Sequence, residues 1–243
     1  MTTFYGYKRL AKSEDWRELA GDENWGPGHA AYELAREWQA AAGLPPGIAK
    51  AIADSKAPEL NGLRLETALF EKPAVLEIPT ASPTANIMGY ARNADGEPVV
   101  LAIEGKAKEA FGLPVRSWLR SDAMEFQRPT QPLPARAKRF EFMCSRLGFG
   151  VDLECQLRYQ LLHRTVAAVT EAELRTAAAA VVVVHAFGSH SNSNWKDFEL
   201  FLEALGSPVP AVGKIAGPIA LGSQRRMPTF FLWWQDDTPG VTS

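Results

Sequence analysis

The chain has 243 residues, 46% of them hydrophobic and 22% charged, which is typical of a soluble globular protein with a sizeable core. A net charge of -2 provides no overall attraction to nucleic acid or membrane, so any such affinity must come from a local patch. No run approaches ~18 apolar residues and no export signal is visible, so we expect a cytoplasmic protein without a membrane partner. Cys144 and Cys155 stand apart, as reduced packing residues do.

The first part of the chain predicts two helices followed by a region with at least one strand. HAAYELAREWQAA, residues 29–41, has apolar residues at helical spacing, and GLPPG then ends the helix. PPGIAKAIADS, residues 45–55, predicts a second, shorter helix. Residues 63–70 fit either a strand or a helix. Residues 74–78, between Pro73 and Pro79, read as a strand.

A hairpin is predicted next, because ANIMGYAR and PVVLAIEGK flank the turn-forming run NADGE. The register depends on the length of the turn. If NADGE is a five-residue loop, Arg92 pairs with Pro98 and Asn86 lies opposite Glu104. A two-residue turn at Asp95 and Gly96 would place Ile87 there instead.

The second half alternates helices and strands. RPTQPLP, residues 128–134, predicts an exposed connection. Helices follow over 135–148 and 152–177, the second with a predicted core face at Leu153, Leu157, Leu161, Val166 and Val169. The valine run up to Phe187 predicts a buried strand, and Gly206 ends a helix beginning near Trp195. Strands at 217–223 and 227–235 complete an α/β fold with a mixed central β-sheet flanked by helices.

Charged residues at the end of an apolar strand are the most informative feature of the sequence. Because side chains alternate along a strand, Glu104 and Lys106 project from the same face as Val100 and Ala102. This arrangement resembles the PD-(D/E)xK nuclease superfamily, in which one hairpin strand carries an acid and the next carries an acid-x-Lys pair. The sequence is also similar to an uncharacterised bacterial family of this nuclease-like type, with ELAxxW, EGKxxExFG and YQLLHR blocks in this order.

The resemblance implies a restriction-endonuclease-like αβββαβ core over about residues 25–205, with a C-terminal β extension over 214–236, in a single domain over 1–243. It implies that Asn86 and Glu104 hold Mg²⁺ and that Lys106 acts beside the attacking water. Glu33, on the first predicted helix, becomes an outer acid, and Gln160 lies near the phosphate. Asn86 stands where the family has an aspartate, and the loss of a charge weakens binding of a divalent cation.

Simpler readings compete with each of these roles. Glu104 and Lys106 also fit an exposed ion pair at the edge of a sheet. Glu33 fits a solvated helical carboxylate, and Gln160 and Arg164 fit a polar outer helix face. His163 and His185 fit packing roles. SHSNSN lacks the GxSxG elbow of a serine hydrolase and is typical of a helix cap.

Two functions follow as hypotheses. The first is a Mg²⁺-dependent nuclease acting on DNA or RNA. The alternative is a nuclease-like domain without cleavage that binds nucleic acid or protein, because Asn86 weakens the metal site. The run FFLWWQ adds a homodimer contact through an outward tryptophan, or ordinary packing within the sheet.

Overall fold

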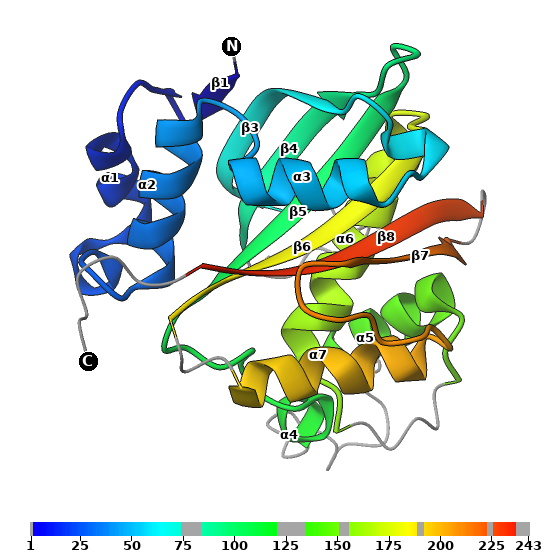
Figure 1. Cartoon of the computed structure of the whole chain (residues 1–243). Helices are drawn as coiled ribbons and strands as arrows, with labels where there is room; N and C mark the ends of the chain where they lie inside the picture. Colours follow the sequence, from blue (N-terminus) through cyan, green and yellow to red (C-terminus); the bar gives the residue numbers. More distant parts are fainter. Residues whose placement is uncertain are drawn as a thin grey trace.

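The computed structural model describes residues 2–73, 84–120, 135–150, 156–188, 192–222 and 226–236. Its helices and strands alternate around one sheet (Figure 1). In chain order the elements are β1 Thr3–Tyr5, β2 Arg9–Leu10, α1 Arg17–Ala20, α2 Ala30–Ala41, α3 Pro46–Asp54, β3 Arg64–Pro73, β4 Thr84–Arg92, β5 Pro98–Lys106, α4 Val115–Arg120, α5 Ala135–Leu147, α6 Tyr159–Leu174, β6 Ala179–Phe187, α7 Asn192–Ala204, β7 Ile215–Leu221 and β8 Met227–Asp236, with 3₁₀ turns at Ser13–Trp16, Asp22–Asn24 and Pro58–Leu60.

The sheet is mixed and runs in the order β2-β1-β3-β4-β5-β6-β8-β7. Strands β3, β4 and β5 are antiparallel neighbours, whereas β5 and β6 are parallel, as are β6 and β8. The predicted α/β class with a mixed central sheet is therefore confirmed. The narrower restriction-endonuclease core stays a prediction, since the chain runs through α2 and α3, three antiparallel strands, the three helices α4, α5 and α6, and then β6 parallel to β5.

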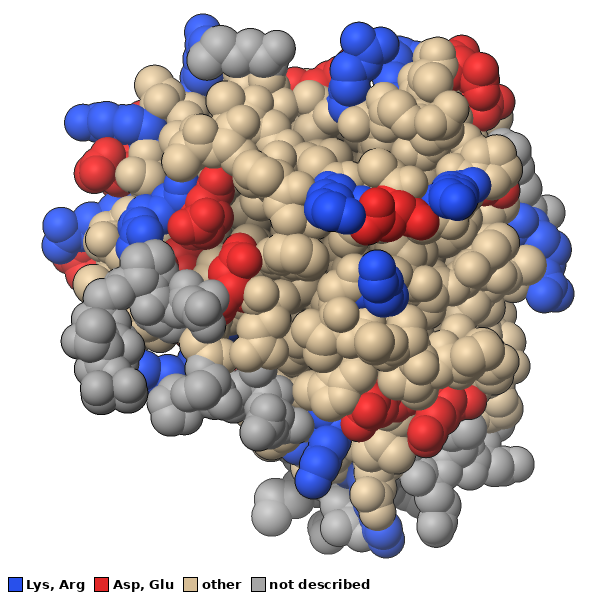
Figure 2. Space-filling view, viewed as in Figure 1, with Lys and Arg blue, Asp and Glu red and all other residues tan. Residues whose placement is uncertain are grey.

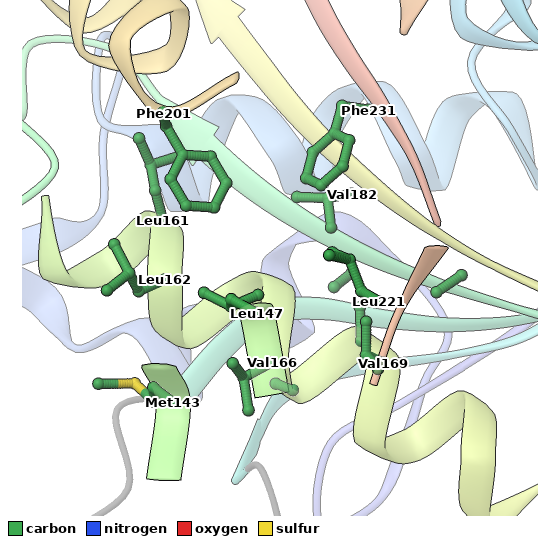
Figure 3. Close-up of a cluster of buried hydrophobic side chains, with 14 of the residues drawn as sticks. Met143, Leu147, Leu161, Leu162, Val166, Val169, Val182, Phe201, Leu221 and Phe231 are labelled. Atoms are coloured by element: carbon green, nitrogen blue, oxygen red, sulfur yellow. The ribbon is translucent and has the colours of Figure 1, made fainter. Parts of the chain in front are cut away.

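Helices cover both faces of the sheet (Figure 1). The sheet separates two hydrophobic clusters, one on each face. Residues of α2 and α3 pack on one face, and residues of α5, α6 and α7 pack on the other. Figure 3 shows the second cluster, in which Leu161 of α6 lies beside Phe201 of α7 and Val182 of β6 lies beside Phe231 of β8. All nine residues of β6 are buried, as expected for a continuous valine run covered on both faces.

The hairpin register follows the five-residue loop. Arg92 pairs with Pro98 and Ile87 with Ile103, which places Asn86 opposite Glu104 one position further along. Residues 63–70 are resolved as strand β3 rather than a helix. The predicted strand at 74–78, the connection at 128–134, Leu153, Cys155 and the first half of SHSNSN lie outside the described residues.

The long predicted helix over 152–177 is shorter and more buried than its leucine stripe indicates. Helix α6 begins at Tyr159, and thirteen of its residues are buried. It lies against β5 and β6 while α5 packs alongside it, so polar positions off the stripe are also enclosed. The polar outer face that served as the simpler reading for Arg164 is therefore wrong, since Arg164 is 3% exposed.

The tryptophans of FFLWWQ pack inside this architecture. Strand β8 lies between β6 and β7 rather than at an edge. Trp233 is buried among aromatic side chains, including Trp195 and Phe198. Trp234 is half-buried against Gly47 of α3. Both tryptophans therefore pack within the protein, and neither supports a homodimer contact.

A hydrogen-bonded chain fixes α2 to the centre of the sheet. The indole N–H of Trp38 donates to Nδ1 of His185 over 3.1 Å, and Nε2 of His185 lies 2.9 Å from Oδ2 of Asp236. Because Nδ1 accepts the hydrogen bond from Trp38, Nε2 carries the ring N–H and donates it to Asp236. The chain joins α2, β6 and β8 on the face opposite Glu104, in agreement with the expected packing role of His185.

Gly105, between Glu104 and Lys106, should tolerate no side chain. A Cβ at this position would lie 2.5 Å from Cδ1 of Leu34 on α2, closer than any relaxed contact. We expect Gly105→Ala to lower the free energy of unfolding by about 1–3 kcal/mol, as overpacking does in cores. Urea denaturation measures this. Gly150→Ala is the control, because nothing lies within 4 Å of a Cβ at Gly150; equal effects in both variants would contradict the packing argument.

Candidate functional site

Glu104 and Lys106 form a buried ion pair in the middle of the sheet. Nζ of Lys106 lies 2.8 Å from Oε1 of Glu104, and the two residues are 4% and 3% exposed, respectively. Strand β5 lies between β4 and β6, so the pair is neither at an edge nor exposed. The simpler reading as an exposed edge pair is therefore wrong. Burial of both charges in a central strand requires compensating partners nearby.

Helix α6 supplies these partners from one of its faces. Nε of Arg164 donates to Oε2 of Glu104 over 2.8 Å, and Nη2 contacts the same oxygen. One turn earlier, Oε1 of Gln160 accepts a hydrogen bond from Nζ of Lys106 at 3.0 Å. The two helical residues, four positions apart, thus match the two strand residues, two positions apart. Both spacings bring side chains to a common face of their element.

The network keeps Glu104 ionised. Burial by itself raises the pKa of this carboxyl, but the positive charges and hydrogen bonds of Arg164 and Lys106 outweigh burial and lower the pKa below its usual value. On the other side of Lys106, the ring centroid of Phe111 lies 5.0 Å from Nζ. The ammonium group is therefore fixed by a carboxylate, an amide and an aromatic face.

Asn86 completes the hairpin side of the site through the backbone. Its Oδ1 accepts a hydrogen bond from the N–H of Gly105 at 2.9 Å. The amide oxygen that the sequence analysis assigned to a metal therefore already has one donor. Asn86 nevertheless lines the same cavity as Glu104, Lys106 and Gln160.

This cavity has a volume of about 390 Å³ and opens beside the end of β5. Glu104 and Lys106 lie buried at its base, Asn86 and Gln160 are half-buried, and Glu109 is exposed. The remaining lining residues come from the region of α1, the beginning of α2, and β5 with the loop that follows it, and they are mostly small or polar: Leu19, Ala20, Asn24, Ala30, Ala31, Gly105 and Ala110. The site is thus a polar hollow with an ion pair at its base.

Glu33 takes a different position from the other predicted site residues. It is fully buried at the beginning of α2, where Oε1 accepts the N–H of Gly28 at 2.8 Å and Oε2 lies 3.3 Å from Nη1 of Arg36. Its burial excludes the simpler reading as a solvated carboxylate. Glu33 does not line the cavity that holds Glu104 and Lys106.

The sequence analysis assigned no role to Glu109, which lines the cavity. Its Oε1 accepts the N–H of Ala30 at 3.1 Å, and its Oε2 accepts the N–H of Ala107 at 2.9 Å. The one feature of the sequence that pointed to Glu109 was its position in the block EGKxxExFG. A loop residue just after a strand has no periodicity that predicts its direction.

The oxygen donors fit the type of ligand that Mg²⁺ accepts, since carboxylates and amide oxygens are hard ligands. The charge balance is less favourable, because two cations already contact Glu104. Among the described residues, no three His, Cys, Asp or Glu side chains cluster closely enough to hold a metal by themselves. A divalent ion here would use Glu104 and Glu109 with amide oxygens and water, and its affinity would be weak.

His163 lies beside this network and remains uncharged. Burial, followed by the charges of Arg164 and Arg139, lowers its pKa to about 3. Its ring stacks on Tyr159 with centroids 5.7 Å apart. This environment agrees with the packing role expected for His163 from the sequence.

The depressed pKa of His163 predicts a pH dependence of stability. An unfolded histidine titrates near 6.5, so between about pH 6.5 and 3 the unfolded state binds a proton that the folded state does not. His163 therefore lowers stability progressively as the pH falls through this window. We expect His163→Phe, which keeps the ring stacking, to lose less stability than the wild type between pH 7 and pH 4, measured by urea denaturation. Parallel curves for the two proteins would contradict the assignment.

Comparison with known proteins gives a family without a known activity. No curated protein and no solved structure matches the chain. None of the helices in the described part of the chain is long and apolar enough to cross a membrane. A family model described as a domain of unknown function, DUF6946, matches residues 9–238, nearly the whole sequence, and the chain therefore belongs to the DUF6946 family.

Proposed function

We propose that this protein is a Mg²⁺-dependent phosphodiesterase of the PD-(D/E)xK type that acts on nucleic acid. The observation that supports the proposal is that Glu104, Lys106, Gln160 and Asn86 all line one cavity, at the end of the hairpin where the family resemblance expects a site. The order of helices, three antiparallel strands, further helices and a parallel strand agrees with it.

The chemistry assigned to each side chain follows from its charge and position. Bound Mg²⁺ would stabilise the charge that develops on a transferring phosphate. Glu104 would offer Oε1, which one group, the ammonium of Lys106, contacts, whereas two nitrogens of Arg164 contact Oε2. The ammonium of Lys106 would favour deprotonation of a water molecule placed next to it, because a nearby positive charge stabilises hydroxide. Gln160 would orient Lys106 through the hydrogen bond between them and present its amide N–H groups to a phosphate oxygen.

The substrate would reach the site from the mouth of the cavity. On the face in Figure 2, positive and negative side chains are interspersed rather than gathered in one basic field. Lys108, exposed and two residues after Lys106, lies close to Gly28 of the loop before α2. Local contacts of this kind, rather than the net charge, would hold the phosphate backbone.

Replacing Lys106 tests the catalytic assignment. We expect the wild type to nick supercoiled DNA or cleave RNA in the presence of Mg²⁺ or Mn²⁺, and Lys106→Gln to lose at least about 100-fold of that rate, as loss of a charge-stabilising group at a reacting centre does. Gel assays of plasmid nicking and RNA cleavage measure the rates. Lys50→Gln, an exposed change on α3 outside the cavity, is the matched control and should retain the rate of the wild type within a few-fold.

Because Lys106 is part of a buried ion pair, its replacement also affects the fold. Rates must therefore be compared at a temperature at which circular dichroism shows Lys106→Gln to be folded. Full nicking or cleavage by the folded variant would exclude Lys106 from the reaction. A wild type that cleaves neither nucleic acid with either metal would reject the enzyme proposal.

The contacts that the carboxylate of Glu104 already makes with cationic side chains favour a second function. Both of its oxygens contact cations, and Asn86 adds no charge. A nuclease-like domain with this charge balance would bind nucleic acid or protein without cleaving nucleic acid. This candidate differs from the first in its affinity for Mg²⁺.

Asn86→Asp distinguishes the two functions. A second carboxylate opposite Glu104 adds negative charge to the cavity, so we expect the affinity for Mg²⁺ to rise at least about tenfold, in line with the dependence of such sites on ligand charge. Isothermal titration calorimetry measures it. Micromolar binding by the wild type would exclude the non-cleaving candidate, and no gain in Asn86→Asp would mean that Asn86 does not face the ion.

A further inference from the structure

Glu109 is the one carboxylate besides Glu104 among the residues that line the cavity. It follows Lys106 by three positions, in the loop that leaves β5, and it is exposed where Glu104 is buried. The hairpin position opposite Glu104 carries Asn86, a neutral side chain. The cavity therefore has two acids, but the second comes from after the strand rather than from the neighbouring strand.

The backbone fixes the direction of the Glu109 carboxylate. One oxygen accepts the N–H of Ala30, the first residue of α2, and the other accepts the N–H of Ala107, just after β5. The main-chain carbonyl of Glu109 also accepts a hydrogen bond of 2.8 Å from Nδ2 of Asn194 on α7. Three separate segments thus hold this loop residue in place, although its side chain is exposed.

The carboxylate keeps capacity for a cation after these contacts. Each carboxylate oxygen has two lone pairs, and each oxygen of Glu109 accepts one backbone hydrogen bond. Oε2 of Glu104, by contrast, receives both contacts from Arg164. Glu109 is therefore less saturated by its neighbours than the acid at the base of the cavity, and no cationic side chain contacts it in an ion pair within the described residues.

We propose that Glu109 is the second carboxylate ligand of a divalent cation in this cavity, where it supplies the charge that Asn86 does not. This inference rests on the proposed metal-dependent function and names one residue of its site. Mg²⁺ commonly binds through one or two carboxylates and keeps several waters, so Glu104 and Glu109 with amide oxygens and water form a sufficient set. Lys106 and Arg164 offset the negative charge of the acids. A carboxylate that neither of these side chains contacts therefore adds most to the affinity of the site for a divalent ion.

The position of Glu109 also has a structural consequence that the test must separate from metal binding. A carboxylate at the N–H of Ala30 stabilises the beginning of α2 through the helix dipole. Replacement of Glu109 therefore lowers stability whether or not a metal binds. A structural role alone cannot be restored by a carboxylate placed at residue 86, whereas a metal-binding role can.

The experiment measures Mn²⁺ binding to the full chain by electron paramagnetic resonance and calorimetry, without nucleic acid. Four proteins are compared: wild type, Glu109→Gln, Asn86→Asp and the double variant. We expect Glu109→Gln to weaken binding about tenfold or more, and the double variant to return to within about threefold of the wild type, because site affinity follows ligand charge. Glu203→Gln, an exposed change on α7, is the control and should bind as the wild type does.

A second measurement uses the unaltered protein and does not depend on the folding of a variant. Carbodiimide coupling to an amine labels exposed carboxylates, and mass spectrometry quantifies the labelling at each residue. We expect Mn²⁺ to protect Glu109 and to leave Glu203 unchanged. Equal labelling of Glu109 with and without Mn²⁺, or equal affinity in wild type and Glu109→Gln, overturns the inference.

The outcomes separate this inference from the proposed function. Mn²⁺ binding that depends on Glu109 without any cleavage of nucleic acid supports the inference and removes the enzyme proposal. Cleavage with unaltered Mn²⁺ binding in Glu109→Gln removes the inference alone. A wild type that binds no Mn²⁺ rejects both.

Discussion

The buried carboxylate of Glu104 determines how the rest of the structure is arranged. An ionised acid in the centre of a sheet is tolerated only if cations and hydrogen bonds replace its water, and here Lys106 and Arg164 do so. Removing one partner of such a group costs about 3–5 kcal/mol, a large share of the stability of a typical domain. Helix α6 must therefore cross β5 at this point, and the cavity forms where β5 ends beside it.

The sequence was sufficient for the features that depend on regular periodicity. The hairpin and the common facing of Glu104 and Lys106 follow from the alternation of strand residues, whereas the sequence left two registers open and the structure selects the one with Asn86 opposite Glu104. The α/β class followed from the interleaving of helical and strand patterns. These properties are local or nearly so, and the structure agrees with them.

The remaining parts of the site depend on long-range packing. Arg164 belongs to a helix enclosed by the sheet and α5, and single-face periodicity cannot predict burial on a second side. Glu33 accepts a hydrogen bond from the loop just before its own helix and does not line the cavity. Glu109 faces the cavity because its carboxylate accepts hydrogen bonds from the backbone N–H groups of Ala107, in the same loop, and of Ala30, far away in the sequence, and no pattern around Glu109 indicates the second contact.

The place of β8 in the sheet has a consequence for how the protein is made. This strand covers the flank of the apolar valine strand β6, yet residues 227–236 are synthesised well after residues 179–187. While a ribosome translates the segment between them, β6 has its hydrogen-bonding groups on that side open to other chains. The sheet is therefore complete only after β8 has paired with β6.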